Sequence, residues 1–205
     1  IVLLDSSNLK KSKEGVQYSL SVWIQTNNLD ANTVWYTSDN VPKTIINNSG
    51  SPNIIYLRRD NIIRFEIAYM NENGLDYYHF DLPHFEAQQW INLILTVDNK
   101  KINVYKNGVL EKSKRLENSN LKNYRMFTLG EKNNNFNGYI GRVDYYNYIL
   151  DSDKIMSLYK KYKNKHPKNL MSYEQYKSLD SNKEDEEMPL KELAIKLGKM
   201  IPNYR

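Results

Sequence analysis

The chain has 205 residues, enough to bury one sizeable core, and its 40% hydrophobic and 12% aromatic content is ordinary for a globular protein. The formal net charge is +5, but the chain has no long basic run interleaved with aromatic residues, so we do not expect direct nucleic-acid binding. The absence of cysteine excludes disulfides, thiolate metal sites and cysteine nucleophiles, and no stretch approaches the roughly eighteen apolar residues that a membrane span needs.

The first half of the chain predicts short strands separated by turn residues. We expect these strands at residues 1–4, 16–25, 43–47, 54–58, 62–69 and 76–82. Their regular spacing favours a β-sandwich over βαβ units. Residues 26–40 interrupt the series as a looser segment. The opening Ile1–Leu4 predicts either a first strand or the end of a signal or membrane-anchor segment that precedes it.

The stretch from Trp90 to Gly108 carries the clearest sheet signal. Residues 91–97 alternate between two faces, which predicts a strand. The chain turns at residues 98–100, returns, and turns again at Asn107–Gly108, the dipeptide that best tolerates the two positive φ angles of a type I′ turn. Two hairpin signals so close together indicate an antiparallel sheet.

The sheet region closes with two more strands and a helix. The strands are expected at residues 126–129 and 139–147. Asp151 or Ser152 then caps a helix that continues to about residue 163. The apolar residues that this helix would bury are Ile155, Leu158 and Tyr159.

Residues 163–205 predict a linker and helical tail, separate from a sheet domain at residues 1–162. Pro189 opens a helix of about twelve residues with one apolar stripe. The stripe consists of Leu190, Leu193, Ala194, Leu197, Met200 and Ile201. Because such a helix is marginal alone, we expect it to pack either on its own sheet domain or in the groove of a partner protein.

The ordered set of pieces resembles the laminin-G-like, concanavalin-A-like jelly-roll family. The pieces are the SxWI-type strand at 19–24, the Trp-initiated strand at 90–98, the hairpin at 102–108 and the closing segment at 136–150. The resemblance implies an all-β, antiparallel two-sheet jelly-roll sandwich with a C-terminal helical extension. It says little about activity, because this scaffold hosts lectins, adhesion modules, glycosidases and virion proteins.

Catalysis is not expected. Glycosidases on this scaffold need closely spaced carboxylates on one strand, whereas Glu66 and Asp144 each stand alone on a predicted strand. His79 and His84 lack a third ligand that would make a metal site. No cofactor is expected, and Ca²⁺ is a minor alternative that the family resemblance implies at rim loops. The turn residues that could serve it, without diagnostic spacing, are Asp39, Asp60, Asp76 and Asp98.

A glycan site would need an exposed aromatic platform. The first candidate is Trp35 with Tyr36 in the irregular segment, and the second is Tyr77 with Tyr78. Trp23 and Trp90 occupy positions that are commonly core in the family, so we expect both to be buried.

Two functions follow. The first is a non-catalytic structural or interaction protein that docks on neighbouring proteins in a large assembly. Within this class, the sequence resembles laminin-G-like domains encoded by large double-stranded DNA viruses with AT-rich genomes, which implies a virion location as a minor capsid or particle-associated protein. The alternative is a lectin-like glycan-binding or adhesion module.

Overall fold

The computed structural model describes residues 2–4, 16–26, 41–48, 51–86, 88–99, 101–116, 120–121, 127–130, 134, 136 and 138–165. Trp35 and Tyr36 lie outside the described residues, and so does the predicted tail stripe from Leu190 to Ile201. The helix that follows the described strands ends at Tyr162, and the domain boundary predicted after it stays a prediction.

Strands dominate the described part of the chain. In chain order they are β1 (Val2–Leu4), β2 (Gln17–Thr26), β3 (Lys43–Asn47), β4 (Asn53–Leu57), β5 (Ile62–Asn71), β6 (Gly74–Leu82), β7 (Ile91–Asp98), β8 (Lys101–Lys106), β9 (Val109–Arg115), β10 (Asn120–Leu121), β11 (Phe127–Leu129) and β12 (Gly138–Tyr146). The helix α2 spans Ser152–Tyr162. All strand pairs are antiparallel, as the hairpin signals predict.

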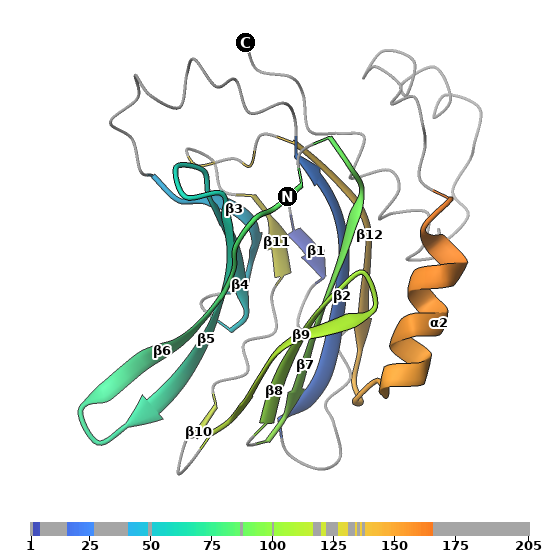
Figure 1. Ribbon diagram of the computed structural model, residues 1–205. Helices are drawn as coiled ribbons and strands as arrows, with labels where there is room; N and C mark the ends of the chain where they lie inside the picture. Colours follow the sequence, from blue (N-terminus) through green and yellow to red (C-terminus); the bar gives the residue numbers. More distant parts are fainter. Residues whose placement is uncertain are drawn as a thin grey trace, which may run out of the picture.

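The strands form two sheets that face each other (Figure 1). The seven-stranded sheet has the order β1-β11-β3-β4-β5-β10, with β6 pairing β5, and the five-stranded sheet has the order β12-β2-β7-β8-β9. Neighbours such as β12 and β2 are far apart in sequence, so the sheets form by long-range pairing rather than by hairpins alone. The predicted two-sheet sandwich is confirmed.

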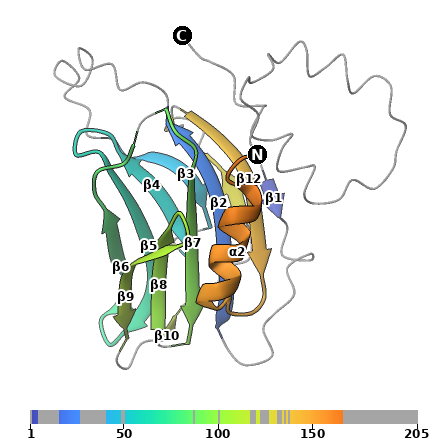
Figure 2. The ribbon, with the colours of Figure 1, turned by 45° about the vertical axis from the view of Figure 1, so that its right-hand side comes forward.

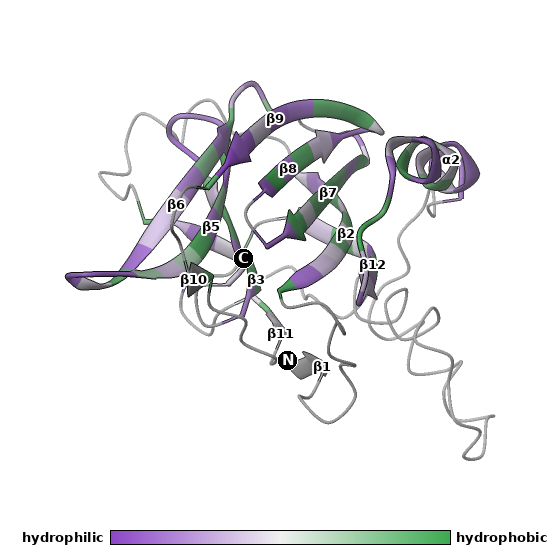
Figure 3. Ribbon diagram, turned by 90° about the horizontal axis from the view of Figure 1, so that it is seen from below, coloured by the Kyte–Doolittle hydropathy of each residue, from purple (hydrophilic) through white to green (hydrophobic). Residues whose placement is uncertain are grey.

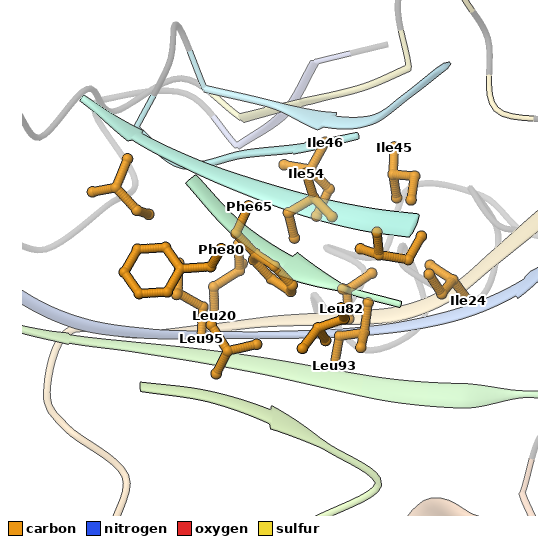
Figure 4. Packing of buried hydrophobic residues seen from close by; sticks show 14 of the residues in the cluster. Leu20, Ile24, Ile45, Ile46, Ile54, Phe65, Phe80, Leu82, Leu93 and Leu95 are labelled. Carbon is orange, nitrogen blue, oxygen red and sulfur yellow. The ribbon is translucent and has the colours of Figure 1, made fainter. Parts of the chain in front are cut away.

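The core lies between the inner faces of the two sheets. Phe65 and Phe80 from one sheet meet Leu93 and Leu95 from the other in a single buried cluster (Figure 4). Alternation along β7 explains why it contributes to two layers, because Ile94 points the other way and packs under α2. Both faces of this strand are therefore buried, as its near-continuous apolar sequence requires.

Helix α2 covers the outer face of the five-stranded sheet (Figure 2). Asp151 is its N-cap and accepts a hydrogen bond from the Lys154 backbone N–H at 2.7 Å. Ile155 is fully buried against the sheet, and the ring of Tyr159 stacks on Trp23 with centroids 5.9 Å apart. The helix thus completes a second, smaller apolar layer.

The β8–β9 turn is the type I′ turn predicted from its sequence. Asn107 and Gly108 have φ angles of 52° and 84°. Glycine is needed at the second position for a further reason, because a Cβ there would lie 3.1 Å from Met156 Sδ on α2. The turn therefore also fixes where the helix approaches the sheet.

The β5–β6 hairpin extends beyond its neighbours, with its turn at the lower left of Figure 1. β4 pairs only with Ile62–Glu66 of β5, and β10 adds only two pairs near the turn. β6 pairs with β5 along its whole length, from Gly74 to Leu82. The hairpin therefore presents a long two-stranded surface with little cover from other strands.

Candidate functional site

The outer face of the β5–β6 hairpin, defined as the face turned away from the five-stranded sheet, carries an ordered series of cross-strand pairs. Phe65 and Phe80 are opposed and point into the core, so the residues between the core positions point outward. From the base to the turn, the outward pairs are Arg64 with Asp81, Glu66 with His79, Ala68 with Tyr77, and Met70 with Leu75. The base half is charged and the turn half is apolar.

One ion pair and one histidine–carboxylate contact hold the charged half. Arg64 Nε and Nη2 donate to the two carboxylate oxygens of Asp81 at 2.7 and 2.9 Å. This hydrogen bonding lowers the pKa of the Asp81 carboxyl below its ordinary value. His79 Nε2 lies 3.5 Å from Glu66 Oε1, and Asn53 donates to the other oxygen of Glu66 at 3.2 Å. These contacts fix the side chains at the base of the surface.

In the apolar half, the two residues of β6 are open to solvent. The side chain of Leu75 is 47% exposed and that of Tyr77 is 38% exposed. Ala68, opposite Tyr77, is fully buried. The solvent face of an antiparallel sheet is usually polar, so two large exposed apolar residues next to each other on this face mark a surface suited to docking.

The inner side of the same hairpin carries an aromatic and polar cluster. The rings of Tyr69 and Tyr78 stack with centroids 4.1 Å apart, and Lys114 Nζ of β9 lies 4.7 Å from the centroid of the Tyr78 ring. Asp76 accepts hydrogen bonds from the Tyr69 hydroxyl at 2.7 Å and from the Tyr77 backbone N–H at 2.8 Å. The Tyr69 hydrogen bond lowers the pKa of the Asp76 carboxyl.

The structure separates two residues that the sequence placed together. Tyr77 and Tyr78 are consecutive in β6 and therefore point to opposite faces, so they cannot form one platform. Tyr78 instead pairs with Tyr69 of β5, which the sequence did not single out. Only the register of the hairpin reveals this partner, because Tyr69 lies next to Asp76 across the strands.

The sequence matches the family described as the concanavalin A-like lectin/glucanases superfamily over residues 2–156. The chain belongs to this superfamily. A search of curated protein sequences gives no match.

Solved structures similar to this superfamily member include receptor-binding domains of botulinum neurotoxins. The serotype G binding domain has 16% sequence identity and a TM-score of 0.59, with 84% of this chain and 39% of that chain covered. The serotype D binding domain has 16% identity and a TM-score of 0.55, covering 76% and 39%, respectively. The chain spans about two fifths of the length of these structures, and the likeness shows a shared fold.

Glucanase-type chemistry in this superfamily would need neighbouring acids. Within the described residues, no group of three or more His, Cys, Asp or Glu side chains could hold a metal ion. Glu66 is held by Asn53 and His79, and Asp144 forms an ion pair with Arg142. Glu66 thus contacts an amide and an imidazole, and Asp144 contacts a guanidinium.

Other predicted residues of this superfamily member have structural roles. Trp23 is 2% exposed, as expected, whereas Trp90 is only half-buried. The carboxylate of Asp98 accepts a hydrogen bond from Gln17 at 2.9 Å. No helix among the described residues is long and apolar enough to cross a bilayer.

Proposed function

We propose that the protein is a non-catalytic interaction module that docks on another protein through the outer face of the β5–β6 hairpin. The observation that carries the proposal is the exposed pair of Leu75 and Tyr77 beside ion pairs that are already internally satisfied. Aromatic residues are enriched at the centres of protein interfaces, where a polar rim surrounds an apolar centre. On the hairpin, Leu75 and Tyr77 form the apolar centre and the charged side chains beside them form part of a polar rim.

Two features support a binding role over a catalytic one. Two acids of the β5–β6 hairpin, Glu66 and Asp81, are engaged by amide, His or Arg groups. Similar solved structures include receptor-binding domains of botulinum neurotoxins, and this chain covers 41% and 37% of two of them, so the fold occurs within proteins that bind receptors. The tail stripe from Leu190 to Ile201 is proposed as a second docking element of the same module.

The finer proposal is that the partner belongs to a virus particle, with this protein as a minor capsid or particle-associated component. It rests on the sequence resemblance to domains of large double-stranded DNA viruses. Mass spectrometry of purified particles from the source checks it, and enrichment of the chain through successive gradients is the expected result. Loss of the chain during those gradients would contradict a particle location.

Site-specific photo-crosslinking tests the docking surface. A photo-reactive phenylalanine analogue placed at Tyr77 should give one discrete adduct in the native assembly, whose partner peptide mass spectrometry identifies. The matched control position is Tyr148, which is 51% exposed but lies on the loop before α2. Leu75→Asp combined with the Tyr77 probe should abolish the adduct. Equal adducts at both positions, or none at Tyr77, would show that this face is not the interface.

The second candidate function is a glycan-binding module, and the Tyr69–Tyr78 stack with Asp76 and Lys114 favours it. Sugars bind on aromatic faces with acid and amide groups nearby, and Asn71 donates to Asp76 at 3.4 Å in this cluster. Retention on immobilised glycans that Tyr78→Ala or Trp35→Ala abolishes, and Tyr77→Ala leaves unchanged, would favour this function. Retention that depends on Tyr77 would instead move the binding site to the outer face.

A further inference from the structure

Among the described strands, β6 and β9 are edge strands, as is β12, which pairs only with β2 and carries one basic and one acidic residue, Arg142 and Asp144. In the described structure β6 pairs only with β5, and β9 pairs only with β8. Edge strands present a row of unpaired backbone N–H and C=O groups that can pair with a strand of another chain. Because β6 has nine residues and β9 has seven, both edges are long enough to form a ladder.

One hydrogen bond shows which backbone N–H and C=O groups of β6 point away from β5, toward the free edge. The Tyr77 N–H bonds the carboxylate of Asp76, which identifies Tyr77 and Ala68 as a pair that is not joined by ladder bonds. Such pairs alternate with bonded pairs along an antiparallel ladder. The residues whose backbone groups point to the free edge are therefore Leu75, Tyr77, His79 and Asp81.

The same alternation applies to β9. Asp98 and Lys101 are the last pair of the β7–β8 hairpin before its turn, so alternation assigns Asn103 of β8 to ladder bonds with β7. Ser113, opposite Asn103, consequently points its backbone groups away from β8. All seven residues of β9 are exposed, and Figure 3 shows the strand changing from apolar at its start to hydrophilic at its end.

The two edges have opposite charge. β6 carries Asp76 and Asp81 and no basic residue other than His79. β9 carries three basic residues against Glu111, a net charge of +2. Pairing β6 with another β6 would bring two acidic strands together, and pairing β9 with another β9 would bring two basic strands together. Pairing β6 with β9 is the combination that electrostatics favours.

Contacts within one chain show that these side chains attract each other. Lys114 of β9 lies over the ring of Tyr78, and the charge of Lys112 contributes to the lowered pKa of Asp81. The basic side chains of β9 therefore already face the acidic strand across the open side of the sandwich. A second copy offers the same groups, together with a free backbone edge.

We propose that β6 of one copy pairs antiparallel with β9 of a second copy, joining the seven-stranded sheet of one to the five-stranded sheet of the other. When Ser113 lies opposite Tyr77, Lys114 falls opposite Asp76. The Ser113 carbonyl then accepts the Tyr77 N–H, and the Asp76 carboxylate is released to bind Lys114. This contact uses the edge of β6, whereas the proposed docking function uses its outer face, so either can fail without the other.

Proline substitutions at the free edges test the pairing. His79→Pro and Ser113→Pro each remove an N–H that points away from the strand's own neighbour, at edge positions where proline is tolerated. The matched controls are His79→Ala and Ser113→Ala, which lose the same side-chain contacts to Glu66 and Asn103 but keep the N–H. Far-UV circular dichroism and the Tm identify the variants that keep the wild-type fold.

Sedimentation velocity of the full chain, up to about 1 mM, provides the readout because it detects weak association. We expect the wild type to self-associate with rising concentration, and each proline variant to weaken association by at least about tenfold relative to its alanine control. Raising the salt concentration should weaken wild-type association, since the charges are exposed.

Mixing the two proline variants gives the decisive result. His79→Pro retains an intact β9 and Ser113→Pro retains an intact β6, so an equimolar mixture should recover a heterodimer that neither forms alone. A wild type that stays monomeric throughout overturns the proposal. Association of Ser113→Pro alone also overturns it, because that result indicates β6–β6 pairing. If one proline variant does not fold, the other variant still tests the proposal. Its self-association is compared with that of its alanine control, and the salt dependence of wild-type association is measured beside it.

Discussion

At the scale of single residues, the two tryptophans of the strand signatures differ in what they stabilise. Trp23 is 2% exposed and stacks on Tyr159 of α2 at an interplanar angle of 13°, whereas Trp90 is half-buried. We expect Trp23→Ala to lower the free energy of unfolding by about 3–5 kcal/mol, the usual range for a fully buried tryptophan. Trp90→Ala should cost about half as much or less, because less of its surface leaves water on folding.

Urea denaturation followed by far-UV circular dichroism measures both losses without relying on the removed fluorophore. Equal losses for the two variants would mean that Trp90 is as important to the core as Trp23. The family resemblance predicted burial for both tryptophans, because both occupy positions that are commonly core in the family. It could not tell them apart, because Trp90 precedes β7 and does not pair with β2, whereas Trp23 pairs with Asn92.

At the scale of secondary-structure elements, the structure decides which of two residues caps the start of α2. The sequence allowed either Asp151 or Ser152 as the cap, and the structure places Asp151 there with its carboxylate bonded to the Lys154 N–H. Asp151→Ala should therefore lower the free energy of unfolding by about 1 kcal/mol. Ser152→Ala is the matched control and should have an effect of at most about 0.5 kcal/mol. Thermal unfolding of both variants checks this, and a larger loss for Ser152→Ala would contradict the assignment.

The strands also show where sequence reasoning succeeds and where it stops. β7 and β12 were predicted to within about a residue, because buried positions recur with a period of two or form an apolar run. β9 was not predicted beyond its turn, since all its residues are exposed and its sequence, VLEKSKR, lacks that period. The Tyr69–Tyr78 stack was missed for a different reason, because it depends on the register between β5 and β6.

At the scale of the whole molecule, buried tyrosines in both sheets make stability depend on alkaline pH. Tyr18 of β2 is 1% exposed and stacks on Tyr145, while Tyr56 of β4 packs edge-on against Phe136. Burial raises the pKa of Tyr18 and raises that of Tyr56 to about 12, because the phenolate loses its solvation in the core. Deprotonation of either hydroxyl is therefore less favourable in the folded state than in the unfolded chain.

The raised pKa values set the direction of the pH effect. An unfolded tyrosine loses its proton near pH 10, so the folded state binds more protons above that pH and its stability falls as the pH rises. Stability is fully present below about pH 10 and is lost between about pH 10 and 12, by about 1.4 kcal/mol per pH unit for each buried tyrosine. The near-ultraviolet absorbance of phenolate should therefore show a late rise that coincides with unfolding. Tyr18→Phe should move the unfolding transition to higher pH, whereas Tyr148→Phe should leave it unchanged. A single titration near pH 10 with the circular dichroism intact would mean that these tyrosines are solvated, and that the two sheets do not close over them.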